Sequence, residues 1–317
     1  MPAVSVVMSV FDGEKWLAEA IESILGQTFT DFEFIIVDDG SQDRTAELVR
    51  TYESRDERIR FFMLERNIGK AAARNYGFEA ARAELVTMMD CDDVSLPERL
   101  EKQVAYLRAN PEIGAVGTGA LMTDEHLRPF YAYGLSERHA CIAFDLLLGP
   151  CVVGATIMMR RAIVKACGGY DATMVRTADI ELVSRLVTQT RLANVTENLY
   201  LYRQHEAQQR FAPQTKRIWA DLTRRLLFQL WGQAPQASLD RFNRVRLREK
   251  INWLERRRAK RDIKRLIEAM IAANWVQADD RNFLISFMNR QLEQTTPRVW
   301  QMFCHWRRHR FGRRERI

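Results

Sequence analysis

The stretch Glu84–Leu96, which reads ELVTMMDCDDVSL, decides how the rest of the chain is interpreted. Its residues 85–89 form an apolar run of the kind found in strands buried on both faces. The run stops at three carboxylates, Asp90, Asp92 and Asp93. Open α/β sheets bind ligands at the carboxyl ends of their strands. Three crowded carboxylates repel one another unless a cation separates them, so the stretch predicts either a divalent-metal site or an acidic turn before a helix.

Strands and helices alternate around this stretch. The expected strands cover residues 3–10, 32–37, 59–64, 85–89 and 113–118. The expected helices, with apolar residues at helical spacing, cover residues 14–25, 43–52, 67–83 and 97–109. This alternation predicts an α/β fold with a mainly parallel, doubly wound sheet flanked by helices. After residue 123 the rhythm loosens, with an apolar run at 152–159, a helix at 178–190 and two short strands at 192–195 and 199–202.

Composition places the chain among globular proteins. Its 317 residues, 47% of them hydrophobic, suffice for one large domain or two ordinary ones. No apolar run approaches the roughly 20 residues that a membrane span needs. The N-terminus lacks the pattern of a signal peptide, so we expect a cytoplasmic protein, soluble or peripheral. The five cysteines are scattered and never in CxxC spacing, which favours reduced thiols over a zinc site or a disulfide framework.

Charge divides the chain into two parts. Residues 1–210 hold 23 Lys and Arg against 31 Asp and Glu, whereas residues 211–317 hold 25 against 10. The second part also has apolar residues at helical spacing, as at Ile263, Leu266, Ile267, Met270 and Ile271. We therefore expect an α/β domain over residues 1–210 and a basic helical extension over residues 211–317.

A second acidic pair follows a second expected strand. Asp38 and Asp39 come directly after the apolar segment 32–37 and precede Gly40 and Ser41. Two strands that end in carboxylates at the same expected edge of one sheet suit an anion bridged through a cation, such as a diphosphate with Mg²⁺ or Mn²⁺. The alternative is a turn followed by a helix cap.

Four ordered motifs resemble those of glycosyltransferase family 2. They are residues 4–13 (VSVVMSVFDG), 37–41 (VDDGS), 67–75 (NIGKAAARN) and 89–93 (MDCDD). The resemblance covers about residues 3–205 and is far more specific than any one motif. The family contains inverting enzymes of the GT-A fold. It implies transfer of a sugar from a nucleotide-diphosphate sugar to a hydroxyl of a cell-envelope, extracellular-polysaccharide or lipid-linked glycan, with UDP the favoured carrier and dTDP an alternative.

The resemblance implies roles for residues on the donor side. Ser9 and Phe11 fall where the family lines the nucleotide base. Asp39 falls where the ring N–H of the base is bound, a sensible role for a buried carboxylate. Lys70 and Arg74 match basic positions near the diphosphate, although Arg74 could also be a surface helix charge.

The Asp-x-Asp motif of the family corresponds to Asp90 and Asp92, with Asp92 the better candidate for the metal. Cys91, between them, counts among the nucleotide-sugar-binding positions and replaces a small residue. Asp93 would contact the metal or cap the next helix. The segment 202–205 resembles the end of the family's catalytic domain, and its His205 could reach the diphosphate or the metal. The implied cofactor is Mn²⁺ or Mg²⁺.

The general base implied by the resemblance is Asp179. The family places it in a Glu-Asp pair after a turn like Gly168-Gly169-Tyr170-Asp171, and here the pair reads Ala178-Asp179. Ala178 is a departure that bears on acceptor contacts and on the pKa of the base. The alternative for Asp179 is a carboxylate that only caps its helix.

Other functions remain open from the sequence. A non-catalytic nucleotide-sugar-binding or scaffold protein is one alternative. A nucleotidyltransferase is less favoured because residues 11–14 lack a glycine-rich basic loop. The absence of a Gln-x-x-Arg-Trp motif speaks against a processive enzyme.

Residues 211–317 admit three interpretations. An Arg-rich end at 307–316 beside Trp306 suits an anionic membrane surface, which would place the protein at the inner face of the membrane near a lipid-linked acceptor. A packed helical extension with a solvated basic face is the second interpretation. Nucleic-acid binding is the third interpretation, but nucleic acid is not an expected partner because no recognised binding fold accompanies the charge.

Overall fold

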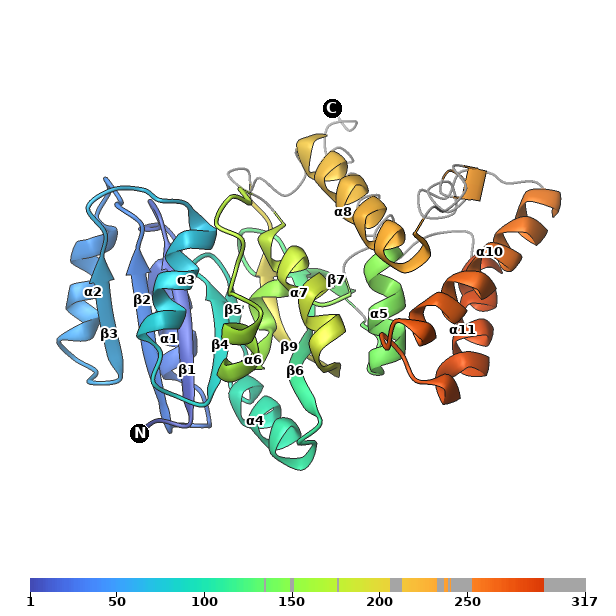
Figure 1. The fold of residues 1–317 in the computed structure, drawn as a ribbon. Helices are drawn as coiled ribbons and strands as arrows, with labels where there is room; N and C mark the ends of the chain where they lie inside the picture. The colour runs from blue at the N-terminus through green and yellow to red at the C-terminus, as the bar shows by residue number, and fades with distance from the viewer. Residues whose placement is uncertain are drawn as a thin grey trace. The chain divides into compact units, whose positions relative to one another are not determined.

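The computed structural model of the chain describes residues 1–133, 135–148, 151–175, 177–205, 213–232, 237–238, 240 and 253–293 (Figure 1). The chain divides into two compact units. One comprises Met1–Glu137 with Val152–Thr215, and the other Arg138–Cys151 with Lys216–Ile317. The domain boundary expected near residue 210 stays a prediction.

Four parallel strands form one half of a nine-stranded sheet, in the order β3-β2-β1-β4 (Figure 1). Their bounds are β1 Val4–Val10, β2 Phe32–Asp38, β3 Ile59–Met63 and β4 Leu85–Asp90. Every residue of β1 and β2 is buried, as continuous apolar runs predict. The connecting helices are α1 Leu17–Leu25, α2 Thr45–Glu53 and α3 Lys70–Ala80. Because α3 packs on β1 and β2, its first turn is held at the carboxyl edge of the sheet.

The two loops that precede α1 and α2 brace each other at this edge. The amide of Glu14 donates to Asp43 Oδ2 at 3.0 Å, and the amide of Arg44 donates to Glu14 Oε2 at 3.1 Å. The amide of Asp12 donates to Ser41 Oγ at 2.9 Å. These bonds occupy residues that the apolar spacing assigns to helices, which explains why α1 and α2 begin two to three residues later than predicted.

The other half of the sheet is mixed. Its strands are β5 Val94–Ser95, β6 Ile113–Thr123, β7 Pro129–Tyr133, β8 Met158–Arg160 and β9 Arg191–Arg203. β8 lies between β4 and β6 and runs antiparallel to both, whereas β6 and β9 are parallel. The expected α/β fold is confirmed, but parallel winding stops at β4. The chain enters β8 from a short 3₁₀ turn, η1 (Gly154–Thr156).

The two short strands expected at 192–195 and 199–202 are one strand, β9. Its pairing with β6 shifts register, since Thr118 pairs with Val195 but Gly119 pairs with Asn198. The polar residues Thr196 and Glu197 lie in this irregularity. A β-bulge at these residues therefore explains why the sequence pattern resembles two separate strands. The helices of this unit's second half are α4 Arg99–Ala109, α6 Arg161–Ala166 and α7 Ala178–Gln189.

The second unit is helical. Its described elements are α5 His139–Leu148, α8 Pro213–Trp231, α10 Trp253–Ala272, η3 Ala278–Asp280 and α11 Arg281–Glu293. Ile263, Leu266, Ile267 and Met270 are buried on one face of α10, which confirms the predicted helical spacing, and α10 packs against α11. The Arg-rich end at 307–316 lies outside the described residues. No helix in the described part of the chain is long and apolar enough to cross a membrane.

Candidate active site

The carboxyl ends of β1, β2 and β4 meet at one edge of the sheet. In the strand register, Ser9 pairs with Val37 on one side and with Asp90 on the other, and Val10 pairs with Asp38. The two acidic clusters expected from the sequence therefore follow the two strands that flank β1. This edge is the place where open α/β sheets bind ligands.

Asp90 lies between two cations that α3 supplies. Its Oδ1 atom is 3.1 Å from Lys70 Nζ and 2.6 Å from an Arg74 terminal nitrogen. Arg74 is buried, so this pair is shielded from water, whereas Lys70 is half exposed. Burial alone would raise the pKa of Asp90, but the two cations outweigh it and hold the pKa well below its ordinary range. Asp90 therefore stays ionised. Arg74 is a buried, paired cation and not the surface helix charge that the sequence also allowed.

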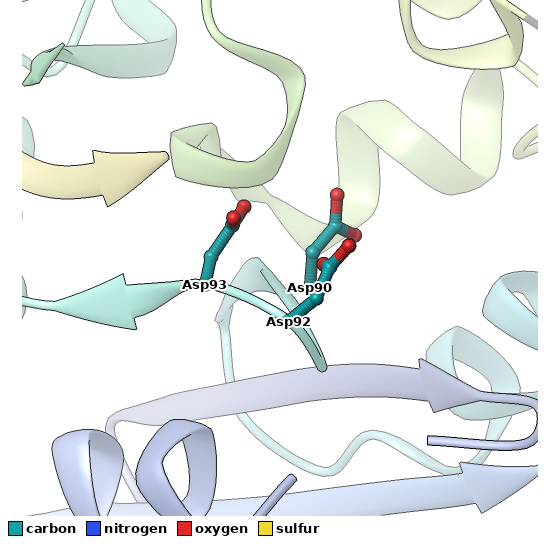
Figure 2. Close-up of side chains that lie close together, drawn as sticks. All are labelled: Asp90, Asp92 and Asp93. Atoms are coloured by element: carbon teal, nitrogen blue, oxygen red, sulfur yellow. The ribbon is translucent and has the colours of Figure 1, made fainter. Parts of the chain in front are cut away.

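The three carboxylates after β4 form a cluster. Oxygen atoms of Asp90, Asp92 and Asp93 all lie within 4.8 Å of one another. Figure 2 shows Asp90 and Asp92 side by side at the end of β4, with Asp93 across the loop at the start of β5. Burial, with the charges of Asp92 and Asp90, raises the pKa of Asp93 well above its ordinary value.

This cluster fits a divalent cation. Lys70 and Arg74 pair with Asp90, and a further positive charge would relieve the repulsion among the three carboxylates. Carboxylate oxygens are the ligands that Mg²⁺ and Mn²⁺ prefer. His205 adds an imidazole, since its Nε2 atom lies 2.9 Å from Asp92 Oδ2. These carboxylate and imidazole ligands suit the expected cofactor, while the identity of the ion stays a prediction.

The Asp-x-Asp loop is held by Arg203, a residue to which the sequence analysis assigned no role. Arg203 is buried; its amide donates to Asp93 Oδ1 at 2.9 Å and its Nε donates to Asp92 O at 2.8 Å. Its guanidinium also pairs with Glu19 and lies 4.2 Å from the centre of the Trp16 ring. The neighbouring His205 in the expected segment 202–205 was the only signal for this role.

The residues expected around the nucleotide base lie at the ends of β1 and β2. Ser9 and Asp39 are buried, whereas Phe11 is 46% exposed. Asp39 accepts backbone hydrogen bonds from Ile68 at 2.7 Å and from Gly69 at 3.0 Å, which joins β2 to the start of α3. Burial raises the pKa of the Asp39 carboxyl despite these two bonds. Contact with a base stays a prediction for all three residues.

Cys91 lies within the acidic loop and is partly exposed. Burial of the sulfur, with the charge of Asp92 next, raises the pKa of its thiol. The thiol is therefore neutral, and a neutral thiol is a weak metal ligand and a weak nucleophile. Its expected place in the donor site remains a prediction.

Asp179, the expected base, lies in the first turn of α7. Thr177 occupies the N-cap position, so Asp179 is not the N-cap residue, although a carboxylate in the first turn also stabilises the helix dipole. Its side chain lies against η1 so closely that a Cβ on Gly154 would be 2.1 Å from Asp179 Oδ2. Arg99, which is fully buried, ties η1 to β4 by donating to Ala155 O and Met88 O.

The two sides of the candidate site meet at Arg74. Burial opposes the charge on Arg74, but Asp90, then Tyr170 and Asp179, raise its pKa. Asp179 therefore lies within electrostatic reach of the cation that holds Asp90. The structure thus brings Lys70, Arg74, the acidic cluster, His205 and Asp179 to one place.

Comparison with known proteins assigns this arrangement to a family. The model for "Glycosyl transferase family 2" matches residues 5–168. An uncharacterized glycosyltransferase of Methanocaldococcus jannaschii is 34% identical over 207 residues, which are 63% of this chain and 70% of that protein. The O-antigen biosynthesis glycosyltransferase WbnJ of Escherichia coli is 32% identical over 211 residues, which are 64% of this chain and 80% of that protein.

A solved structure shows the same fold. The crystal structure of S. aureus TarS, residues 1–349, in complex with UDP-GlcNAc matches with a TM-score of 0.59 and 19% identity. The match covers 93% of this chain and 89% of that one. At this identity the likeness concerns the fold alone.

Proposed function

The chain belongs to glycosyltransferase family 2 and is a glycosyltransferase, and from this premise we propose that it transfers a sugar from a UDP-sugar to a hydroxyl acceptor with inversion. Membership of the family disfavours a nucleotidyltransferase and a purely binding protein. The observation that carries the proposal is the pairing of Asp90 with Lys70 and Arg74 inside a cluster of carboxylates at the ligand-binding edge of the sheet, with Asp179 exerting an electrostatic effect on the same Arg74. A donor diphosphate and an acceptor hydroxyl need neighbouring cationic and basic groups of this kind.

Asp179 is the proposed general base. Its carboxylate takes the proton of the acceptor hydroxyl while the hydroxyl oxygen bonds to the anomeric carbon. In the same step the bond from the anomeric carbon to the diphosphate oxygen breaks, and UDP leaves with the electron pair. Because attack and departure occur on opposite faces, the anomeric configuration inverts.

Lys70 and Arg74 are the proposed contacts of the leaving diphosphate. Both already carry positive charge beside Asp90, so they need no reorganisation when negative charge develops. Asp92, Asp90 and His205 would hold a divalent ion, and Arg203 would hold in place the loop that carries Asp92. A bound Mn²⁺ or Mg²⁺ would supply further neutralisation of the diphosphate.

UDP is the proposed carrier, and a cell-envelope glycan the proposed acceptor. An exposed aromatic ring at Phe11 beside a buried carboxylate at Asp39 suits a pyrimidine base. The S. aureus neighbour was solved with UDP-GlcNAc, and the E. coli relative is named for O-antigen biosynthesis. These names support the proposal for this chain by analogy.

An anionic membrane surface is the proposed partner of the helical unit. Arg257, Arg258, Arg261, Lys264 and Arg265 are all exposed and recur at the spacing of one helix face. Within the part of the chain that the structure describes, no carboxylate forms an ion pair with any of the five. Leu254 is exposed one turn before this row, and Phe228 is exposed one turn after the exposed Arg225 on α8. Cations beside exposed apolar side chains suit a lipid headgroup layer.

Nucleotide binding tests the proposal without knowledge of the acceptor. We expect UDP with Mn²⁺ to raise the Tm of the protein more than ADP with Mn²⁺, and EDTA to reduce the shift. Asp92→Asn should lose the Mn²⁺ dependence, whereas the exposed control Asp31→Asn should keep it. A UDP shift that EDTA leaves unchanged would contradict the metal, and a larger shift with ADP would contradict the pyrimidine carrier.

A further inference from the structure

The turn at residues 168–171 is joined to α3 by a reciprocal pair of hydrogen bonds. Asn75 Nδ2 donates to Tyr170 O at 2.7 Å, and the Tyr170 amide donates to Asn75 Oδ1 at 2.8 Å. The approach is so close that a Cβ on Gly169 would lie 2.6 Å from Asn75 Oδ1, and Gly169 has a φ of +69°. Only glycine meets both requirements without strain. The backbone of Tyr170 is therefore fixed against α3.

The ring of Tyr170 lies along one turn of α3. It stacks on Phe78, with ring centres 5.5 Å apart and planes 2° from parallel. The guanidinium carbon of Arg74, one turn earlier, is 5.2 Å from the centre of the Tyr170 ring. Tyr170 is 2% exposed, and burial raises the pKa of its hydroxyl to about 12, so the ring is neutral and electron-rich. A buried aromatic face attracts a guanidinium more strongly than an exposed one.

Arg74 therefore has two anchors of different kinds. Asp90 holds one terminal nitrogen through a charged hydrogen bond, and the guanidinium carbon lies over the Tyr170 ring. With the ring removed, the long side chain would keep one point of attachment and could rotate about it. Phosphate recognition by arginine depends on the orientation of the guanidinium, because its donors form a rigid fork.

We infer that Tyr170, held in place by Asn75, is a positioning residue that orients Arg74 toward the donor diphosphate. The inference rests on the proposed function, which places a nucleoside diphosphate beside Arg74. It also means that the turn at 168–171 contributes to donor binding. The same segment leads into the helix that carries Asp179. A change in this turn should thus affect donor affinity as well as the base.

A double-mutant cycle on UDP affinity tests the inference. The Kd of UDP with Mn²⁺ is measured by calorimetry for wild type, Tyr170→Leu, Arg74→Ala and the double variant, each checked for folding by its Tm. We expect Tyr170→Leu to weaken UDP binding about tenfold. In the Arg74→Ala background, the same change should have no further effect. Tyr170→Phe retains the ring and should restore most of the affinity.

Two further variants complete the experiment. Phe62→Leu removes a ring with the same two kinds of contact, to Arg60 at 5.4 Å and to Tyr76 at 5.5 Å, and should leave the Kd unchanged. Asn75→Ala tests the same point if Tyr170→Leu does not fold, and should weaken UDP binding only while Arg74 is present. Additive effects of the Tyr170 and Arg74 changes, or an equal loss in Phe62→Leu, would overturn the inference alone. Wild-type protein that binds no nucleoside diphosphate would overturn the proposed function and the inference together.

Discussion

At the scale of single residues, the acidic side chains of the site differ in their surroundings. Asp90 is paired with two cations and stays ionised, while Asp93 is buried beside like charges and has a raised pKa. Asp179 lies against the backbone of Gly154 without a hydrogen bond to any other described side chain. The pairing of Asp90 with Lys70 and Arg74 favours Asp179 over Asp90 as the base.

Asp179→Asn should abolish most turnover while leaving donor binding intact. Loss of a general base costs about 100- to 10,000-fold in rate, and an amide of the same shape leaves Arg74 and the acidic cluster in place. The measurements are UDP release under saturating donor and the Kd of UDP with Mn²⁺. Glu181→Gln is the control, because Glu181 lies in the same first turn but pairs with Arg185. Turnover near that of wild type would refute the assignment of the base.

Residue types in short motifs predicted much of the site but not its supports. Asp90, Asp92, Lys70 and Arg74 come together as expected because they follow strands or begin a helix at one edge. Arg203 and Asn75 contact groups some ninety to a hundred and ten residues away in the chain. No local spacing reports such contacts, so the motifs 67–75 and 202–205 contained these two residues without revealing what they contact.

At the scale of elements, buried parallel strands and amphipathic helices were predicted best. The apolar runs of β1, β2 and β4 can be interpreted only as buried strands. The buried face of α10 follows the helical repeat of its apolar residues. β5 and β7 were missed because the first is only two residues long and the second is half exposed, so neither has a clear apolar pattern.

Reversal of charge on α10 should weaken binding to anionic vesicles. Each cation near such a surface contributes about 1 kcal/mol, so Arg257→Glu, Arg261→Glu and Lys264→Glu together should lower affinity at least about 100-fold. Cosedimentation with phosphatidylglycerol-containing and pure phosphatidylcholine vesicles measures the effect. The control reverses three exposed arginines of the first unit, Arg44, Arg55 and Arg128. Equal binding by the α10 variant and wild type would place the membrane contact elsewhere, or exclude it.

At the scale of the whole molecule, the order of strands departs from a simple winding. Repeated strand–helix units predicted that β1 to β4 are parallel, because each connection there is a helix, whereas their order β3-β2-β1-β4 came from the structure. Beyond β4, β8 inserts antiparallel between β4 and β6, and this pairing brings η1 beside Asp179. Pairing between strands that lie far apart in the sequence leaves no periodic pattern. The acceptor side of the site was therefore less predictable than the donor side.

The stereochemistry of donor cleavage tests the central claim most directly. Purified protein with Mn²⁺ and an α-linked UDP-sugar is followed by proton NMR, with water as the acceptor when no other is present. The account predicts that the released sugar appears first as the β-anomer, before mutarotation, and that Asp179→Asn releases far less. Initial release of the α-anomer, or release at the same rate by wild type and Asp179→Asn, would contradict it.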